Sequence, residues 1–156
     1  MILTATVLSF VAAPAALADH HETSALKGKI HEFYQNLSKG DYEAAFNFVH
    51  DGSRGFTHEG MLKELPNEAV KGMVRSQMKE DREKGYVFKA HPKHINITDI
   101  NEGAALATYY VEGTIDQPQG KPESLLNRGS LVLTKVDGDW KIAHWHISKL
   151  ESEGKD

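Results

Sequence analysis

Residues 125–150 read LLNRGSLVLTKVDGDWKIAHWHISKL, and this stretch decides the fold class. It contains two strand-like runs, 125–136 and 140–150. Asp137 and Gly138 lie between them, and an Asp-Gly pair in this position is the strongest short-range signal for a β-hairpin. The chain is therefore predicted to end in two antiparallel strands.

Two further strand-like segments precede this hairpin. Residues 93–100, KHINITDI, alternate isoleucine with polar residues, and residues 104–115 are rich in β-forming residues. The stretch 116–122 holds two prolines and a glycine, which predicts a turn before the hairpin. We therefore expect an antiparallel sheet in the second half of the chain.

The first half has helical periodicity instead. Apolar residues recur at helical spacing in residues 24–39, and Gly40 can end that helix in the left-handed conformation. Asp41 is expected to cap a second helix over 41–50.

A segment rich in glycine and polar residues, 51–66, follows, with a short strand expected near Phe56. Asn67 then caps a third expected helix, which runs to about Lys84. Helices followed by an antiparallel sheet predict an α+β fold, in which three N-terminal helices pack on one sheet face. The domain is expected over 24–150.

The composition is that of an ordinary globular protein. The chain has 156 residues, 40% hydrophobic and 26% charged, which predicts one domain. Its formal net charge of −4 argues against nucleic-acid binding, which needs a basic surface. The absence of cysteine excludes disulfides and thiolate chemistry.

The N-terminus has the pattern of a secretory signal peptide. Residues 2–13 are apolar and uncharged, and Ala16-x-Ala18 supplies small residues for cleavage before Asp19. No Lys or Arg precedes the apolar run, so an uncleaved anchor or a buried helix is the alternative. We expect a signal peptide over 1–18, a periplasmic or secreted protein, and no membrane contact after cleavage. Residues 19–23 are expected to form a polar leader, and residues 151–156 a frayed tail.

Several short motifs, in their order, resemble those of a known family. They are the segment 40–44 (GDYEA), Ile115-Asp116, Asp137-Gly138-x-Trp140, and the alternating segment 144–148 (HWHIS). The chain resembles the SnoaL-like, nuclear transport factor two-like superfamily, and most of all the association domain of calcium/calmodulin-dependent kinase. The resemblance implies a cone-shaped fold with a strongly curved sheet. It does not imply one function, because this superfamily contains enzymes, oligomer hubs and proteins of unassigned role.

The residues that carry function in these relatives are missing at the matching positions. The ketosteroid isomerase tyrosine falls at Phe33, and its aspartate base falls near Thr57. Tyr34 is adjacent, but one helical residue turns a side chain by about 100°. The pocket arginines of the kinase hub fall at Tyr110 and Leu131. Neither steroid isomerase chemistry nor that carboxylate pocket is therefore predicted.

The paired histidines of the last strand are the leading candidates for a pocket. His144 and His146 are two residues apart, so both rings are expected on one strand face, together with Trp140 and Ile142. This spacing suits a metal site or an acid–base pair, and it equally suits core histidines at a pocket floor. Trp145 should point the opposite way, where it is a candidate anchor for a homodimer interface or a cap on the core.

Three other residues are weaker pocket candidates. His58 precedes Glu59 and is either a base beside a carboxylate or part of a solvated loop. Tyr109 and Tyr110 face opposite sides of their strand, so one of them can offer a hydroxyl to the cavity, and Tyr110 is the candidate. Arg128 lies mid-strand, where it either pairs with Glu112 or holds an anionic ligand.

A metal site is expected at the N-terminus if cleavage occurs after Ala18. The new α-amine of Asp19, two backbone amides and the imidazole of His21 can bind Cu(II) or Ni(II) in a square plane, with His20 as an outer contact. The alternative is that these residues form only the polar leader. We predict no other cofactor.

These observations favour an exported protein that binds a small, partly apolar molecule between its helices and sheet. An isomerase, dehydratase or hydrolase that uses a cavity histidine is the alternative, and an oligomerisation module without a ligand is the second. A homodimer is expected in each case.

Overall fold

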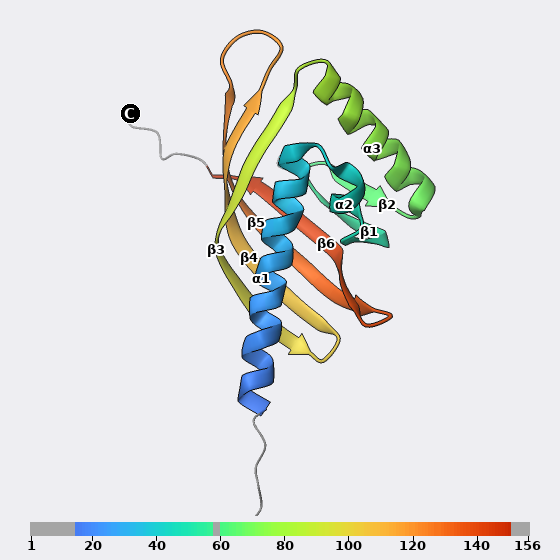
Figure 1. Cartoon of the computed structure of the whole chain (residues 1–156), viewed down its shortest axis with the longest axis vertical. Coiled ribbons are helices and arrows are strands. Elements are labelled where there is room, and N and C mark those ends of the chain that lie inside the picture. Colours follow the sequence, from blue (N-terminus) through green and yellow to red (C-terminus); the bar gives the residue numbers. More distant parts are fainter. Residues whose placement is uncertain (1–14, 58–59, 151–156) are drawn as a thin grey trace, which may run out of the picture.

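The computed structural model describes residues 15–57 and 60–150, and it describes the side chains of the first helix from Glu22 onward. Three helices lie against one face of a six-stranded sheet (Figure 1). In chain order the elements are α1 (Ala15–Lys39), α2 (Tyr42–Phe46), β1 (Val49–Phe56), β2 (Leu62–Leu65), α3 (Glu68–Glu83), β3 (Val87–Asn101), β4 (Ala104–Asp116), β5 (Glu123–Val136) and β6 (Asp139–Lys149). The predicted α+β class is confirmed.

The strand order in the sheet is β2-β1-β6-β5-β4-β3. All neighbouring strands are antiparallel except β1 and β6, which run parallel. The expectation of a wholly antiparallel sheet is therefore wrong at one pair. The parallel pair arises because β1 follows the short helix α2 and joins the free edge of the last strand.

The predicted helix caps are present. Asp41 accepts a hydrogen bond from the Ala44 amide, and Asn67 accepts one from the Val70 amide, both at 3.1 Å. Gly40 has φ +84° and ends α1. The helix α1 begins at Ala15, before the expected start at residue 24. Residues 19–23, which were expected to form a polar leader, are therefore part of this helix.

The second helix is shorter than expected. It ends at Phe46, and the residues that were expected to complete it begin strand β1. The Ile142 amide donates to the Phe48 carbonyl at 2.7 Å, so pairing with β6 replaces the helical hydrogen bonds. A contact so distant in sequence overrides the local helical pattern.

The edge strand β3 is longer than its isoleucine pattern predicted. Pro92 lies inside it, which is tolerated because an edge strand has one side without a partner. His94 has φ +51° and lies where the β3–β4 register shifts, between Lys93 and Asn96. The strand therefore contains a bulge.

The helices are attached to the sheet by polar as well as apolar contacts. Ser38 of α1 accepts a hydrogen bond from the Ala90 amide of β3 at 3.1 Å. Lys71 of α3 is buried and donates to the Val49 carbonyl at 3.1 Å, with Asp51 at 2.6 Å. Burial alone would lower the pKa of Lys71, but Asp51 and Glu68 together raise it.

The start of α1 is fixed to the β5–β6 hairpin. Glu22 accepts a hydrogen bond from the Trp140 indole at 2.8 Å and pairs with Lys135. Both contacts lower the pKa of Glu22, and the hydrogen bond with Lys135 has the larger effect. In the part of the chain that the structure describes, no helix has the length and hydropathy of a membrane-spanning segment.

Candidate functional site

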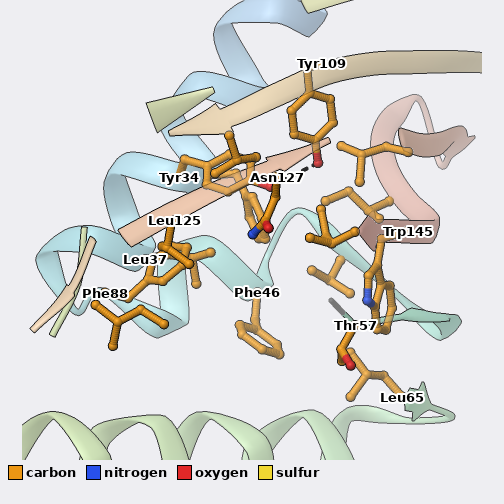
Figure 2. Close-up of a pocket in the computed structure, with 17 residues that line it drawn as sticks. Tyr34, Leu37, Phe46, Thr57, Leu65, Phe88, Tyr109, Leu125, Asn127 and Trp145 are labelled. Atoms are coloured by element: carbon orange, nitrogen blue, oxygen red, sulfur yellow. Dashed lines mark hydrogen bonds between the residues drawn. The ribbon is translucent and has the colours of Figure 1, made fainter. Parts of the chain in front are cut away.

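A cavity of about 270 Å³ lies between the helices and the inner face of the sheet (Figure 2). Almost all of its lining is apolar or aromatic, contributed by α1, the α2–β1 region and strands β2 to β6. The lining side chains are Phe33, Tyr34, Leu37, Phe46, Val49, Thr57, Leu65, Phe88, Tyr109, Val111, Ile115, Leu125, Asn127, Leu131, Ile142, Trp145 and Ile147.

Two tyrosines supply the strongest polar feature of this cavity. The hydroxyl oxygens of Tyr34 and Tyr109 are 3.0 Å apart, within hydrogen-bond distance, and both residues are buried. Burial raises the pKa of Tyr34 to about 12 and raises that of Tyr109 well above its usual value. Both hydroxyls are therefore protonated at neutral pH, and the pair has one proton in its own bond and one more to donate.

Asn127 supplies a second polar group on the same wall. It is 6% exposed, and its amide lies in the cavity beside the tyrosine pair (Figure 2). A side-chain amide offers two donor hydrogens and one acceptor oxygen. Thr57 and Trp145 lie together at the other end of the cavity.

The two histidines of β6 do not line this cavity. The β5–β6 register shifts so that Leu133 pairs with Ile142 but Val132 pairs with His144, which leaves Ala143 as an extra residue. This bulge reverses the alternation along the strand. The expectation that His144 and His146 share a face with Ile142 is therefore wrong.

The same bulge turns Trp145 inward. Trp145 lines the cavity together with Ile142 and Ile147, so its expected position on the helix-free face, as an interface anchor, is wrong. The alternative, that Trp145 packs against the core, agrees with the structure.

Tyr110 and Arg128 also lie on the outer, helix-free face. They are paired across β4 and β5, and both line an outer groove with His146. The structure therefore brings together three of the predicted pocket residues, but on the opposite side of the sheet from the cavity. Their inward neighbours, Tyr109 and Asn127, carry the polar groups of the cavity.

Sequence reasoning missed Asn127 and chose Tyr110 rather than Tyr109, although a signal for the inner face was present. Tyr109 alternates with the apolar residues Ala105, Ala107 and Val111, which marks the inner face of β4. Tyr34 was set aside because Phe33 occupies the matching position, yet both side chains reach the cavity.

The remaining predicted site residues lie outside the described part of the structure. They are His58 and the side chains of Asp19, His20 and His21, so the N-terminal copper site stays a prediction. Among the described residues, no group of three or more His, Asp or Glu side chains is placed to hold a metal ion.

A comparison of the sequence with family models identifies a family with this fold. The model of the SnoaL-like domain matches residues 28–151. The chain belongs to the SnoaL-like domain family. This SnoaL-like protein has no match among the curated proteins.

Solved structures share the fold of this SnoaL-like protein at low sequence identity. One is a protein from Novosphingobium aromaticivorans with the suggested activity of a scytalone dehydratase (15% identity, 85% of this chain and 87% of that chain, TM-score 0.72). Another is a ketosteroid isomerase-like protein from Erwinia carotovora atroseptica (15%, 84% and 98%, TM-score 0.68). The association domain of Caenorhabditis elegans CaMKII is a third (18%, 88% and 100%, TM-score 0.63). They confirm the predicted cone fold, and the match to the family model confirms the predicted SnoaL-like family.

Proposed function

We propose that this SnoaL-like protein binds a small, mainly apolar molecule that carries one hydrogen-bond acceptor, such as a carbonyl oxygen. The observation that supports this function most strongly is the Tyr34–Tyr109 hydroxyl pair inside an apolar cavity. Its spare proton is a donor that a buried acceptor on the ligand can satisfy.

The size of the cavity limits the ligand. Its volume of about 270 Å³ is near the lower end of the range of roughly 300–1,000 Å³ for ligand pockets. An apolar cavity of about 150 Å³ accommodates benzene. One or two fused rings with a short substituent therefore suit this cavity.

The polar groups favour binding over acid–base catalysis. Among the described residues that line the cavity, none is a histidine or a carboxylate. The tyrosines stay protonated, because burial raises both pKa values, and so act as donors rather than bases.

Two ligands of nearly equal shape test this proposal. 2-Acetylnaphthalene carries a carbonyl oxygen, whereas 2-ethylnaphthalene has none. Fluorescence of Trp145 at the cavity wall reports binding, with Trp140 as the other tryptophan. We expect the ketone to bind about five- to tenfold more tightly, which corresponds to one net hydrogen bond of about 1 kcal/mol.

The double variant Tyr34→Phe/Tyr109→Phe should remove most of that preference and leave 2-ethylnaphthalene binding nearly unchanged, because either hydroxyl of the pair can supply the spare proton. Lys79→Gln, on the exposed side of α3, is the control and should bind both probes like the wild type. Equal affinities for the two probes in the wild-type protein would refute the assigned role of the hydroxyl pair. Failure of both to bind would refute the cavity site.

The same ketone tests the enzyme alternative. The neighbours of known structure include a ketosteroid isomerase-like protein, and a donor pair suits polarisation of a carbonyl. An isomerase needs a base as well. Loss of the acetyl methyl NMR signal in D₂O with protein present would establish proton abstraction. No loss beyond the buffer rate supports binding alone.

We also propose that the chain forms a homodimer through the outer, helix-free face that was first expected, but at its β1–β2 end and with other residues than Trp145. Phe56 and Leu62 lie opposite each other on β1 and β2 and are 42% and 52% exposed. They offer an apolar patch in place of Trp145. Native mass spectrometry of the wild type and of Phe56→Ser should show a dimer that the substitution weakens, and a wild-type monomer would refute the proposal.

Export is proposed from the apolar run and the Ala16-x-Ala18 sequence. Cleavage after Ala18 retains Glu22 and its contacts with Trp140 and Lys135. Intact-mass measurement of the protein from its native host should show a chain that begins at Asp19. A mass matching all 156 residues would refute cleavage.

A further inference from the structure

The outer face of the sheet carries a groove of about 380 Å³ that the proposed cavity function does not use. It crosses strands β3 to β6, and its main side chains are His94, Asn96, Tyr110, Arg128, His146 and Ser148. None of the described residues that line it is an aspartate or a glutamate. Its one permanently charged side chain is therefore the Arg128 guanidinium.

A neighbouring strand orients Arg128. Its Nε donates to the Ser148 hydroxyl of β6 at 2.9 Å. The bond uses the Nε–H group, and among the described residues neither terminal nitrogen of Arg128 has a hydrogen-bond partner. The two terminal nitrogens form the planar fork that matches the two oxygens of a carboxylate.

Aromatic and apolar side chains form the walls beside this fork. Tyr110 pairs with Arg128 across β4 and β5 and is 45% exposed. Its ring contacts the His94 ring edge-on, with the ring centroids 6.2 Å apart. The His146 ring packs edge-on against Phe56 at 6.3 Å. Leu150 also lines the groove. A flat ring can therefore lie between side chains whose positions are already constrained.

We propose that this outer groove is a second binding site, for a small carboxylate with a flat apolar body. Arg128 holds the carboxylate through its two terminal nitrogens, and Tyr110 and His94 contact the ring. The site differs from the cavity, because Arg128 and Tyr110 line only the groove and Asn127 lines only the cavity, although Tyr109 contributes to both linings.

Benzoate, inorganic phosphate and benzyl alcohol test the two requirements of the site separately. Phosphate supplies the charge without the ring, and benzyl alcohol supplies the ring without the charge. NMR titration of the backbone amides of Ser130 and His146 measures each affinity. We expect benzoate to bind at least fivefold more tightly than either of the others. Equal binding of phosphate or of benzyl alcohol would overturn the proposal.

Variants of the fork locate the ligand. Arg128→Gln should weaken benzoate binding at least tenfold, since charged hydrogen bonds contribute about 1.5–3 kcal/mol. Arg128→Lys should weaken it at least threefold, because the charge remains but the fork is lost. Ser148→Ala should weaken it about two- to fivefold by releasing the guanidinium.

Two controls distinguish binding at this site from a general effect of positive charge and from binding in the cavity. Lys79→Gln removes one positive charge on α3, far from the groove in sequence and fold, and should leave benzoate affinity within twofold. Tyr34→Phe alters only the cavity and should also leave it unchanged, and the indole N–H signal of Trp145 should not move. Unchanged affinity in folded Arg128→Gln, or benzoate shifts centred on Trp145, would overturn the outer site.

Discussion

The two faces of the sheet differ in how their polar groups are used. On the inner face, polar atoms are few and buried: the hydroxyls of Tyr34 and Tyr109 are paired, and Asn127 is beside them. On the outer face, polar groups are numerous and exposed, and within residues 15–57 and 60–150 Arg128 has Ser148 as its one hydrogen-bond partner. The inner face therefore suits an apolar ligand with one polar group, and the outer face suits an anion.

One residue determines which side chains of β6 belong to each face. Without the bulge at Ala143, the strand would bury His144 and His146 and expose Trp145 and Ile147. The difference between the faces is thus a property of strand pairing rather than of composition. The predictions that follow test this assignment, beginning with the largest effect.

Deletion of both Ala143 and His144 should have the largest effect. Deletion of Ala143 alone would remove the extra residue and keep the native faces, but deletion of both residues would pair Trp145 with Val132. His146 would then point into the core, and Trp145 and Ile147 would face water. We expect a loss of roughly 5 kcal/mol or more in the free energy of unfolding, from lost apolar burial and buried polar groups. Urea denaturation measures it.

Ala143→Ser is the matched control, because it keeps the residue count of the strand. It should cost about 1 kcal/mol or less. A deletion variant as stable as this control would show that the bulge does not assign the faces.

Alkaline pH should destabilise the inner face next most strongly. The folded protein holds the pKa of Tyr34 at about 12, against 10.0 as the ordinary value. A raised pKa means that the stabilisation is fully present below about pH 10 and is lost as the pH rises through about 12. Each pKa unit corresponds to about 1.4 kcal/mol, so Tyr34 should account for a loss of about 3 kcal/mol.

Urea denaturation at several pH values checks this loss, with Tyr34→Phe as the reference. The wild type should lose about 2 kcal/mol more than Tyr34→Phe between pH 10 and pH 12, which is about two-thirds of the full loss, because other titrating groups are common to both. Parallel pH profiles for the two proteins would contradict the burial of Tyr34.

Gly129→Ala should have an intermediate effect. A Cβ at this inward-facing position would lie 2.7 Å from the Tyr109 ring, so the ring must move. We expect a loss of about 2 kcal/mol, as for other overpacked cores, and a weaker preference for the ketone probe. Gly28→Ala is the control: nothing lies within 4 Å of its added Cβ, and a helical alanine should stabilise slightly. Wild-type stability in Gly129→Ala would show that the inner face tolerates added volume.

His146→Ala should have the smallest effect on stability. The side chain is on the outer face and exposed, so the free energy of unfolding should change by about 0.5 kcal/mol or less. Thermal denaturation measures it. A loss above 2 kcal/mol would indicate a buried imidazole and would reverse the assignment of the faces.

Local signals in the sequence predicted much of the fold. Gly40, Asp41 and Asn67 fix helix ends through contacts within a few residues, and Asp137-Gly138 fixes the hairpin in the same way. These interactions depend little on the rest of the chain, so sequence reasoning finds them.

The candidate site depends on distant pairing and was predicted less well. Simple alternation along β6 predicts one face with Trp140, Ile142, His144 and His146. Only the pairing with β5 reveals that Ala143 is an extra residue. The short helix α2 is a second case, because β6 draws the chain after Phe46 into the sheet. Nothing within either segment signals these changes.

The parallel pairing of β1 with β6 also has a consequence for folding kinetics. Val49 pairs with Ile142, so the β1–β2 hairpin joins the sheet only through the strand that is synthesised last. Pairing between distant segments slows folding, because the long loop must close before the contacts form. A nascent chain of this SnoaL-like protein therefore cannot complete its sheet, or enclose the cavity against Trp145, before β6 has been made.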